Sequence, residues 1–114
     1  MTSISEDTAT PSEVLVKTTL RVVAALQIDE TQLATILGVD KALLTVAIEP
    51  ASCQGLRALQ LIRIYQRLSA ITGNDNATMS QWMTTTNRRF DCSPIKLMQT
   101  AEGLDEVTFY LDSL

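Results

Sequence analysis

The segment between Ser52 and Gly73 predicts one long, uninterrupted helix. A serine can cap the first turn of a helix, and a glycine can take the left-handed backbone that ends one. Because the apolar face inside this segment is unusually broad, we expect the helix to lie at the centre of the fold, with neighbours on both sides. Apolar residues recur at every third position, at Leu56, Leu59, Ile62, Tyr65, Leu68 and Ile71. Two more, Leu61 and Ile64, widen this face.

Shorter helices are predicted before this central one. An apolar run that opens at Pro11 suits a helix over residues 12–27, since proline is accepted at the first position of a helix. Asp29 and Gln32 have the spacing of a capping box. The helix that they begin is expected to stop at Gly38.

Three further helices are predicted after the central one. Thr78 and Gln81 again have capping-box spacing and predict a helix that ends at Asn87, a residue type that tolerates left-handed backbone. The Ser-Pro pair at residues 93–94 predicts a cap followed by proline at the first helical position, with a helix running through residue 100. Gly103 is expected to end that helix.

The last helix is expected to start at Asp105 and Glu106, which favour the N-terminus of a helix. With no alternating, strand-like run anywhere, the sequence predicts an all-α fold. We expect three parts: a flexible N-terminal segment (1–11), a helix-turn-helix-like helical region (12–73) and a smaller C-terminal helical region (74–114).

The amino-acid composition excludes most enzyme classes. The 114 residues include no histidine, which removes Ser-His and Cys-His nucleophile pairs and imidazole metal ligands. No carboxylate pair stands beside a nucleophile or a glycine-rich phosphate loop. The two cysteines, Cys53 and Cys92, are expected to be buried, reduced thiols. The sequence therefore predicts a protein that is not an enzyme and needs no cofactor, metal or small-molecule substrate.

The chain is also expected to stay in the cytoplasm, away from membranes. Its densest apolar run, Leu56 to Leu68, is interrupted by three arginines, so it is no candidate for a spanning helix. The acidic, polar N-terminus does not resemble a signal peptide. A net charge of −4 means that any contact with DNA must come from a local basic patch.

Residues 29–49 have the helix, glycine turn and helix spacing of a helix-turn-helix, with the second helix capped by Asp40 and ending before Pro50. A plain corner between two helices explains the same pattern. The second helix offers few of the side chains that read base edges. The DNA-contact candidates are Lys41, Thr45 and Arg57, and the affinity for DNA is expected to be weak or lost.

The C-terminal third resembles a known family. Its ordered pattern is similar to the toxin-binding domain of the Xre/MbcA/ParS antitoxins, most specifically over residues 82–111 and weakly from about residue 20. Thr86 and the Asp91-Cys92 pair depart from the family pattern, which is expected to alter the loop but not the fold. The matching residues are Trp82-Met83, Asn87, Phe90, Ser93-Pro94, Leu97-Met98, Thr100, Gly103, Val107 and Leu111.

The resemblance implies an Xre-like helix-turn-helix that packs through the long central helix onto a small toxin-binding domain. It implies a type II antitoxin that neutralises a RES-domain toxin, which consumes NAD or transfers ADP-ribose. The implied assembly is a homodimer, and operator DNA is a further, weakly bound partner. A stand-alone helix-turn-helix repressor without a toxin partner is the alternative.

The candidate residues of the C-terminal region fall into two sets. Those expected to build the core of the motif are Trp82, Phe90, Pro94, Leu97, Gly103, Val107 and Leu111. Those expected to contact the toxin are Asn87, Arg88, Arg89, Asp91, Lys96 and Tyr110. Two adjacent arginines in a short link are suited to an interface because arginine is enriched among interface hot spots.

Overall fold

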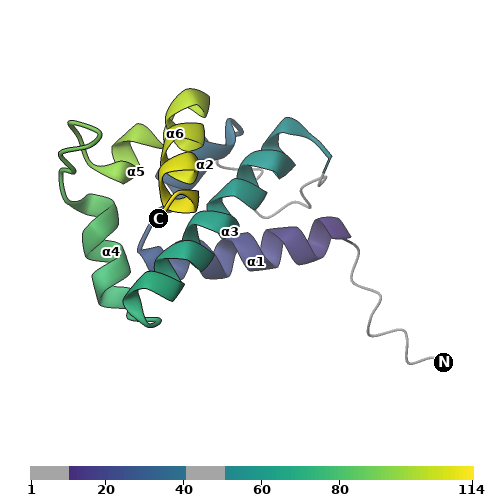
Figure 1. The fold of residues 1–114 in the computed structure, drawn as a ribbon. Coiled ribbons are helices and arrows are strands. Elements are labelled where there is room, and N and C mark those ends of the chain that lie inside the picture. The colour runs from purple at the N-terminus through teal and green to yellow at the C-terminus, as the bar shows by residue number, and fades with distance from the viewer. Residues whose placement is uncertain (1–10, 41–50) are drawn as a thin grey trace.

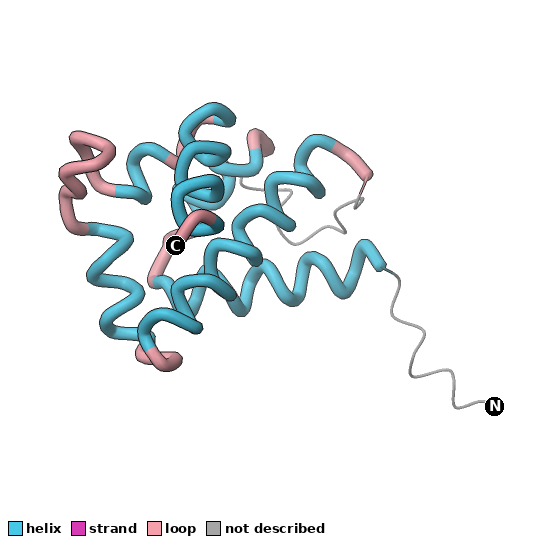
Figure 2. Tube along the Cα trace, in the orientation of Figure 1, coloured by secondary structure: helices cyan, strands magenta, loops and turns pink. Residues whose placement is uncertain are grey.

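The computed structural model describes residues 11–40 and 51–114, which form six helices and no strand (Figures 1 and 2). The predicted all-α class is confirmed for these residues. The predicted N-terminal segment and the predicted second helix of the helix-turn-helix fall largely outside the described residues. The helices are α1 (Pro11–Leu26), α2 (Glu30–Leu37), α3 (Cys53–Thr72), α4 (Asn76–Thr84), α5 (Pro94–Leu97) and α6 (Ala101–Asp112).

Helix α3 holds the fold together, as predicted. It contacts α1, α2, α4 and α6, and Figure 1 shows it crossing the middle of the molecule. The hydroxyl of Ser52 accepts the N–H of Gly55 at 3.0 Å, so the predicted cap is confirmed. Gly73 ends the helix with φ 68°, the left-handed backbone that glycine adopts without a steric cost.

The buried face of α3 differs from the predicted one. Leu61 and Ile64 are fully buried, whereas Leu56, Leu59 and Ile71 stay exposed at 56%, 45% and 56%. The reason is geometric. A residue every third position steps around an α-helix by about 60°, so such a repeat winds around the helix and cannot stay on one face.

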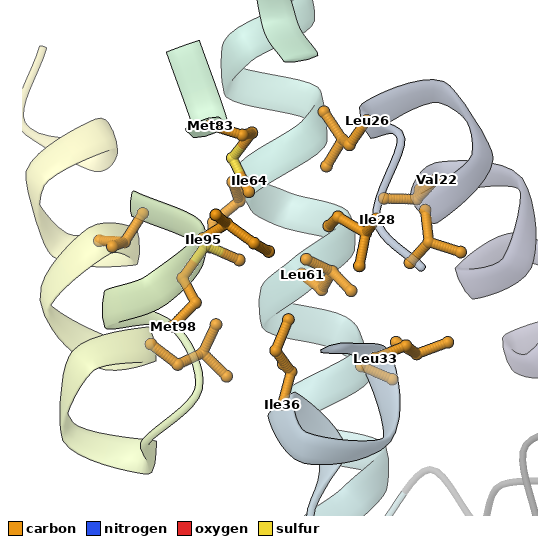
Figure 3. Close-up of a cluster of buried hydrophobic side chains, with 14 of the residues drawn as sticks. Val22, Leu26, Ile28, Leu33, Ile36, Leu61, Ile64, Met83, Ile95 and Met98 are labelled. Atoms are coloured by element: carbon orange, nitrogen blue, oxygen red, sulfur yellow. The ribbon is translucent and has the colours of Figure 1, made fainter. Parts of the chain in front are cut away.

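The hydrophobic core lies on both sides of this buried face. Figure 3 shows Leu61 and Ile64 between residues of α1 and α2 on one side and residues of α4 and α5 on the other. The core is continuous from Leu15 to Leu111. The C-terminal helices are therefore positioned by the same core as α1 and α2.

The predicted helix that Asp29 begins and Gly38 ends is confirmed. The N–H of Gln32 donates to the Asp29 carboxylate at 2.7 Å, and the N–H of Asp29 donates back to the Gln32 side chain at 3.1 Å. Gly38 ends α2 with φ 75°. Arg57 of α3 donates to the carbonyl of Leu37 at 3.3 Å, which places a positive charge at the C-terminus of α2.

Helix α4 begins and ends three residues earlier than predicted. Its cap is Asp75, whose carboxylate accepts the N–H of Ala77 at 3.1 Å and the hydroxyl of Thr78 at 2.7 Å. Thr78 therefore supports the cap from inside the first turn. The helix ends at Thr84 and Thr85 is extended, so the prediction that Asn87 is the exit residue is wrong.

The prediction that Gly103 ends a helix is also wrong. Helix α5 already ends at Leu97, and Gly103 lies in the first turn of α6, where its N–H donates to the hydroxyl of the capping Thr100 at 2.9 Å. A Cβ built on Gly103 would overlap the carbonyl oxygen of Leu97. Glycine is needed here because the end of α5 approaches the backbone of α6 so closely.

Candidate functional site

The loop between α4 and α5, residues 85–93, is closed by hydrogen bonds to Asn87 (pink at the upper left in Figure 2). The N–H of Asn87 donates to the carbonyl of Cys92 at 3.0 Å, and its own carbonyl accepts the N–H of Phe90 at 3.1 Å. Its side-chain oxygen accepts the N–H of Arg89 at 2.8 Å. These bonds hold the loop in one shape with its arginine side chains outside. We call residues 85–93 the Asn87 loop.

The Asn87 loop is fastened to α6 through aromatic contacts. The guanidinium carbon of Arg89 lies 5.4 Å from the ring centre of Tyr110, within the range of a cation–π interaction. The rings of Phe90 and Tyr110 meet edge to face, with centres 5.3 Å apart and planes at 80°. Because Phe90 is buried, it anchors the loop while Arg89 stays exposed on the tyrosine ring.

The residues predicted to contact a partner differ in exposure. Arg89 and Tyr110 are brought together although they are far apart in the sequence. Asp91 has φ 60°, a left-handed backbone that aspartate tolerates, and Lys96 adds a positive charge on α5. The exposed members are Arg88, Arg89, Asp91 and Lys96, and the partly buried ones are Asn87 and Tyr110.

Most residues predicted to form the core of this region are buried. Two of the set, Trp82 and Leu97, are only partly buried, and both pack against the core from its edge. The buried ones are Phe90, Pro94, Gly103, Val107 and Leu111.

Trp82 also lines a surface groove that the sequence analysis did not predict. The groove has a volume of about 290 Å³ and runs along α4 into the Asn87 loop. Its lining carries no charged side chain. A sequence signal was available for part of it, because Thr78 and Gln81 share one side of α4 at the spacing i, i+3. The lining residues are Thr78, Gln81, Trp82, Thr85, Thr86 and Asn87.

Of the predicted DNA-contact residues, only Arg57 lies in the described part of the chain. Lys41 and Thr45 lie outside the described residues. Arg57 is partly buried and holds the C-terminus of α2 through its bond to Leu37. Its guanidinium therefore has a structural contact that the sequence analysis did not anticipate.

Sequence reasoning also missed an exposed aromatic residue. Phe109 of α6 is 72% exposed. It falls outside the buried stripe of Leu104, Val107 and Leu111, and its position in the helix could have revealed this. Cys53 is likewise exposed at the start of α3 and Cys92 is partly buried, so the prediction of two buried thiols is wrong.

Arginines of α3 and a carboxylate of α6 join these two helices at the surface. The Nε atoms of Arg63 and Arg67 lie 2.9 Å and 3.2 Å from the Asp112 carboxylate. The hydrogen bond from Arg63, followed by that from Arg67, lowers the pKa of Asp112 below its ordinary value of 3.8. The hydroxyl of Thr78 similarly lowers the pKa of Asp75.

Acid is expected to weaken the contact between α3 and α6. Because the pKa of Asp112 is lower in the folded chain, its contribution to stability is present above pH 3.8 and is lost as the pH falls through that value towards the lowered pKa. The effect should be small because the pair is exposed. In thermal melts recorded at a series of pH values from above 3.8 downwards, we expect the melting temperature of the wild type to fall more steeply with pH than that of Asp112→Asn. Equal slopes would contradict this role of Asp112.

The described residues contain neither a metal-binding cluster nor a membrane-spanning helix. Residues 11–40 and 51–114 hold no group of three His, Cys, Asp or Glu side chains arranged to bind a metal ion. None of the helices described is both long and apolar enough to span a bilayer. What these residues do offer is a loop with exposed arginines beside an uncharged groove.

Residues 67–114 match the model of a protein family, described as the antitoxin Xre/MbcA/ParS C-terminal toxin-binding domain. The match starts in the second half of α3 and covers α4, α5, α6 and the Asn87 loop. The predicted resemblance to this family is confirmed over these residues. No curated protein is similar enough to the chain to count as a match.

Proposed function

We propose, from the match of residues 67–114 to an antitoxin toxin-binding domain, that this chain is a type II antitoxin. It would neutralise its toxin by stoichiometric binding, without acting as an enzyme. The match is the observation that carries the proposal, because it covers all the elements that build the Asn87 loop and the groove beside it.

The geometry of the Asn87 loop supports a role in binding the toxin. Arginine and tyrosine are enriched among interface hot spots, and Arg89 lies on the ring of Tyr110. The backbone bonds around Asn87 order the loop before a partner arrives, which lowers the entropy lost on binding. We propose that the toxin contacts the exposed residues of the Asn87 loop and also Lys96 and Tyr110. The groove at Trp82 would extend this contact surface. A stable interface would bury about 1,600 Å² in total.

The toxin class follows from the resemblance. We propose a RES-domain toxin that consumes NAD or transfers ADP-ribose, and that binding hinders NAD from reaching the toxin's cleft. Both proteins would act in the cytoplasm. The antitoxin itself would contribute contacts and no chemical step.

Operator binding is a second proposed role for the N-terminal region, residues 12–73, in a homodimer. The capping box of α2 and the left-handed Gly38 support this role, since a helix followed by a glycine turn is how a helix-turn-helix begins. Because Arg57 donates to the carbonyl of Leu37, its guanidinium is already occupied, and we expect the affinity for DNA to be weak. A mobility-shift assay on the native promoter at about 50 and 200 mM salt tests this role, because phosphate contacts make DNA affinity fall steeply with salt.

Reversing the charge of Arg88 and Arg89 together is expected to reduce toxin binding at least about 100-fold, as the loss of hot-spot residues does. The partner to test is the product of the neighbouring reading frame, which the proposal expects to be a RES-type toxin, co-expressed with this chain. Binding is measured by titration, and neutralisation by recovery of growth. The matched control is Lys17→Glu with Arg21→Glu, which makes the same charge change at two exposed positions of α1.

Two outcomes would contradict the proposal at different levels. A wild-type chain that neither binds the toxin nor restores growth would refute the antitoxin function. Normal binding by the Arg88 and Arg89 variant, with unchanged helical content, would remove the Asn87 loop from the interface. A promoter band that this chain forms alone, together with failure to bind the toxin, would instead favour the stand-alone repressor.

A further inference from the structure

The guanidinium of Arg89 is held in place without the use of its hydrogen-bond donors. Its central carbon lies 5.4 Å from the centre of the Tyr110 ring, and the backbone N–H of Arg89 is bound to the Asn87 side chain at 2.8 Å. The face of a ring attracts the positive charge, whereas the five N–H groups of a guanidinium still need acceptors. Within residues 11–40 and 51–114, none of these five groups donates to an acceptor. Arg89 is therefore positioned and still able to bind an acceptor on a partner.

The arginines of α3 show the contrast. Arg63 and Arg67 both bind the Asp112 carboxylate, at 2.9 Å and 3.2 Å. In the part of the chain that the structure describes, neither the two arginines of the Asn87 loop nor Lys96 forms such an ion pair. The loop and the start of α5 therefore present positive charge that no described carboxylate neutralises.

The charge at the Asn87 loop is opposite to the charge of the whole chain. The chain carries a net charge of −4, but the loop and Lys96 together present three exposed basic side chains and one exposed acidic one, Asp91. Glu106, one turn before Tyr110 on α6, forms no ion pair with the loop within the described residues. Because interfaces pair regions of opposite potential, this positive region suits a partner surface that carries carboxylates.

We propose that Arg89 binds an aspartate or glutamate side chain on the toxin's surface, and that Tyr110 is a positioning residue that holds the guanidinium for this contact. The inference rests on the proposed antitoxin function and adds the chemistry of the toxin's side. A carboxylate has two oxygens that match the guanidinium fork, so it can accept two parallel N–H bonds. Arg88 and Lys96 would add attraction at longer range.

The same chemistry argues where on the toxin the Asn87 loop lies. Phosphate groups are bound by positive side chains and by the N–H groups of helix N-termini. A cleft that holds the pyrophosphate of NAD is therefore positive, and it would repel two arginines and a lysine. We expect the loop to bind an acidic surface beside the cleft, and the rest of the antitoxin to cover the entrance.

A carbodiimide cross-link tests the proposed contact directly. Arg89→Lys keeps the charge and supplies a primary amine, which carbodiimide joins to a neighbouring carboxylate as an amide. The partner is the product of the neighbouring reading frame, in complex with the full chain at concentrations above the dissociation constant. We expect mass spectrometry to find an amide between position 89 and one Asp or Glu of the toxin. Arg21→Lys, the same change at an exposed position of α1, is the control and should give no such link.

Exchanging the charges tests whether this contact contributes to affinity. Replacing the carboxylate found by cross-linking with lysine should weaken binding of the wild-type antitoxin at least about tenfold, because two positive charges then face each other. Pairing this toxin variant with Arg89→Glu should recover at least about tenfold, since the attraction is restored with the signs exchanged. Arg21→Glu is the matched control and should recover nothing.

The role of Tyr110 is tested by comparing two backgrounds. Tyr110→Leu removes the ring at Arg89 and should weaken toxin binding about tenfold, whereas Tyr110→Phe keeps the ring and should lose much less. In an Arg89→Gln background, Tyr110→Leu should cost far less, because no guanidinium is left to hold. An equal loss in both backgrounds, or equal losses for Tyr110→Leu and Tyr110→Phe, would show that Tyr110 does not act through Arg89.

Failure of this proposal can be told from failure of the proposed function. A wild-type chain that does not bind the toxin refutes the antitoxin function. A wild type that binds, but with no cross-link specific to Arg89→Lys or no recovery by Arg89→Glu, overturns the carboxylate contact alone. Retention of duplex DNA at about 50 mM salt by the wild type, lost when Arg88→Gln and Arg89→Gln are combined, would overturn it in favour of phosphate binding.

Discussion

Replacing Gly103 with alanine is expected to destabilise the fold by about 3 kcal/mol or more, as severe overpacking does. Alanine is the best helix former, so propensity alone predicts the opposite sign. The added Cβ, however, would overlap the carbonyl oxygen of Leu97 and lie 2.7 Å from its carbonyl carbon. These are backbone atoms, which cannot swing aside as a flexible side chain can, so α5 and α6 would have to separate.

Urea-induced unfolding monitored by circular dichroism measures this cost. Two control variants show how much of this cost comes from the overlap with Leu97. One measures the cost of replacing a glycine where there is open space, and the other measures the cost of losing the cap of α6. Gly73→Ala adds a methyl group in open space at φ 68° and should cost only about 1 kcal/mol. Thr100→Ala removes the cap of α6 and should also cost about 1 kcal/mol. A Gly103→Ala variant no less stable than these controls would show that the close approach does not constrain the fold.

Gly103 illustrates what the sequence could not reveal about this fold. Caps that depend on side chains a few residues apart were predicted correctly, as at Asp29 and Ser52, because all the interacting groups are local in the sequence. The same local reasoning read Gly103 as a helix end. Its real constraint is the carbonyl of Leu97 at the end of another helix, which becomes visible only once α5 and α6 are packed together.

In the candidate site, too, the sequence revealed individual residues but not the contacts between distant parts of the chain. The sequence identified Asn87, Arg88, Arg89, Asp91, Lys96 and Tyr110 as candidates, one by one. It could not place Arg89 on the ring of Tyr110, because that contact depends on how Phe90 seats the loop against α6. Nor could it show that Trp82 is only partly buried beside a groove, since its spacing alone fits a core position equally well.

Substituting Leu61 and Leu59 separately with alanine is expected to give very different losses of stability from the same chemical change. Leu61 is fully buried between α1 and the C-terminal helices, so its truncation leaves a cavity and should cost about 2 to 5 kcal/mol. Leu59, two positions earlier on the same helix, is 45% exposed and should cost less than about 1 kcal/mol in the monomer.

Denaturant unfolding at low protein concentration, where any dimer has dissociated, measures both costs. The pair tests the orientation of α3 itself. The apolar repeat in the sequence gives Leu59 and Leu61 equal claims to the core, and only the rotation of the helix decides between them. Similar losses for both variants would mean that α3 is turned towards the repeat that begins at Leu56.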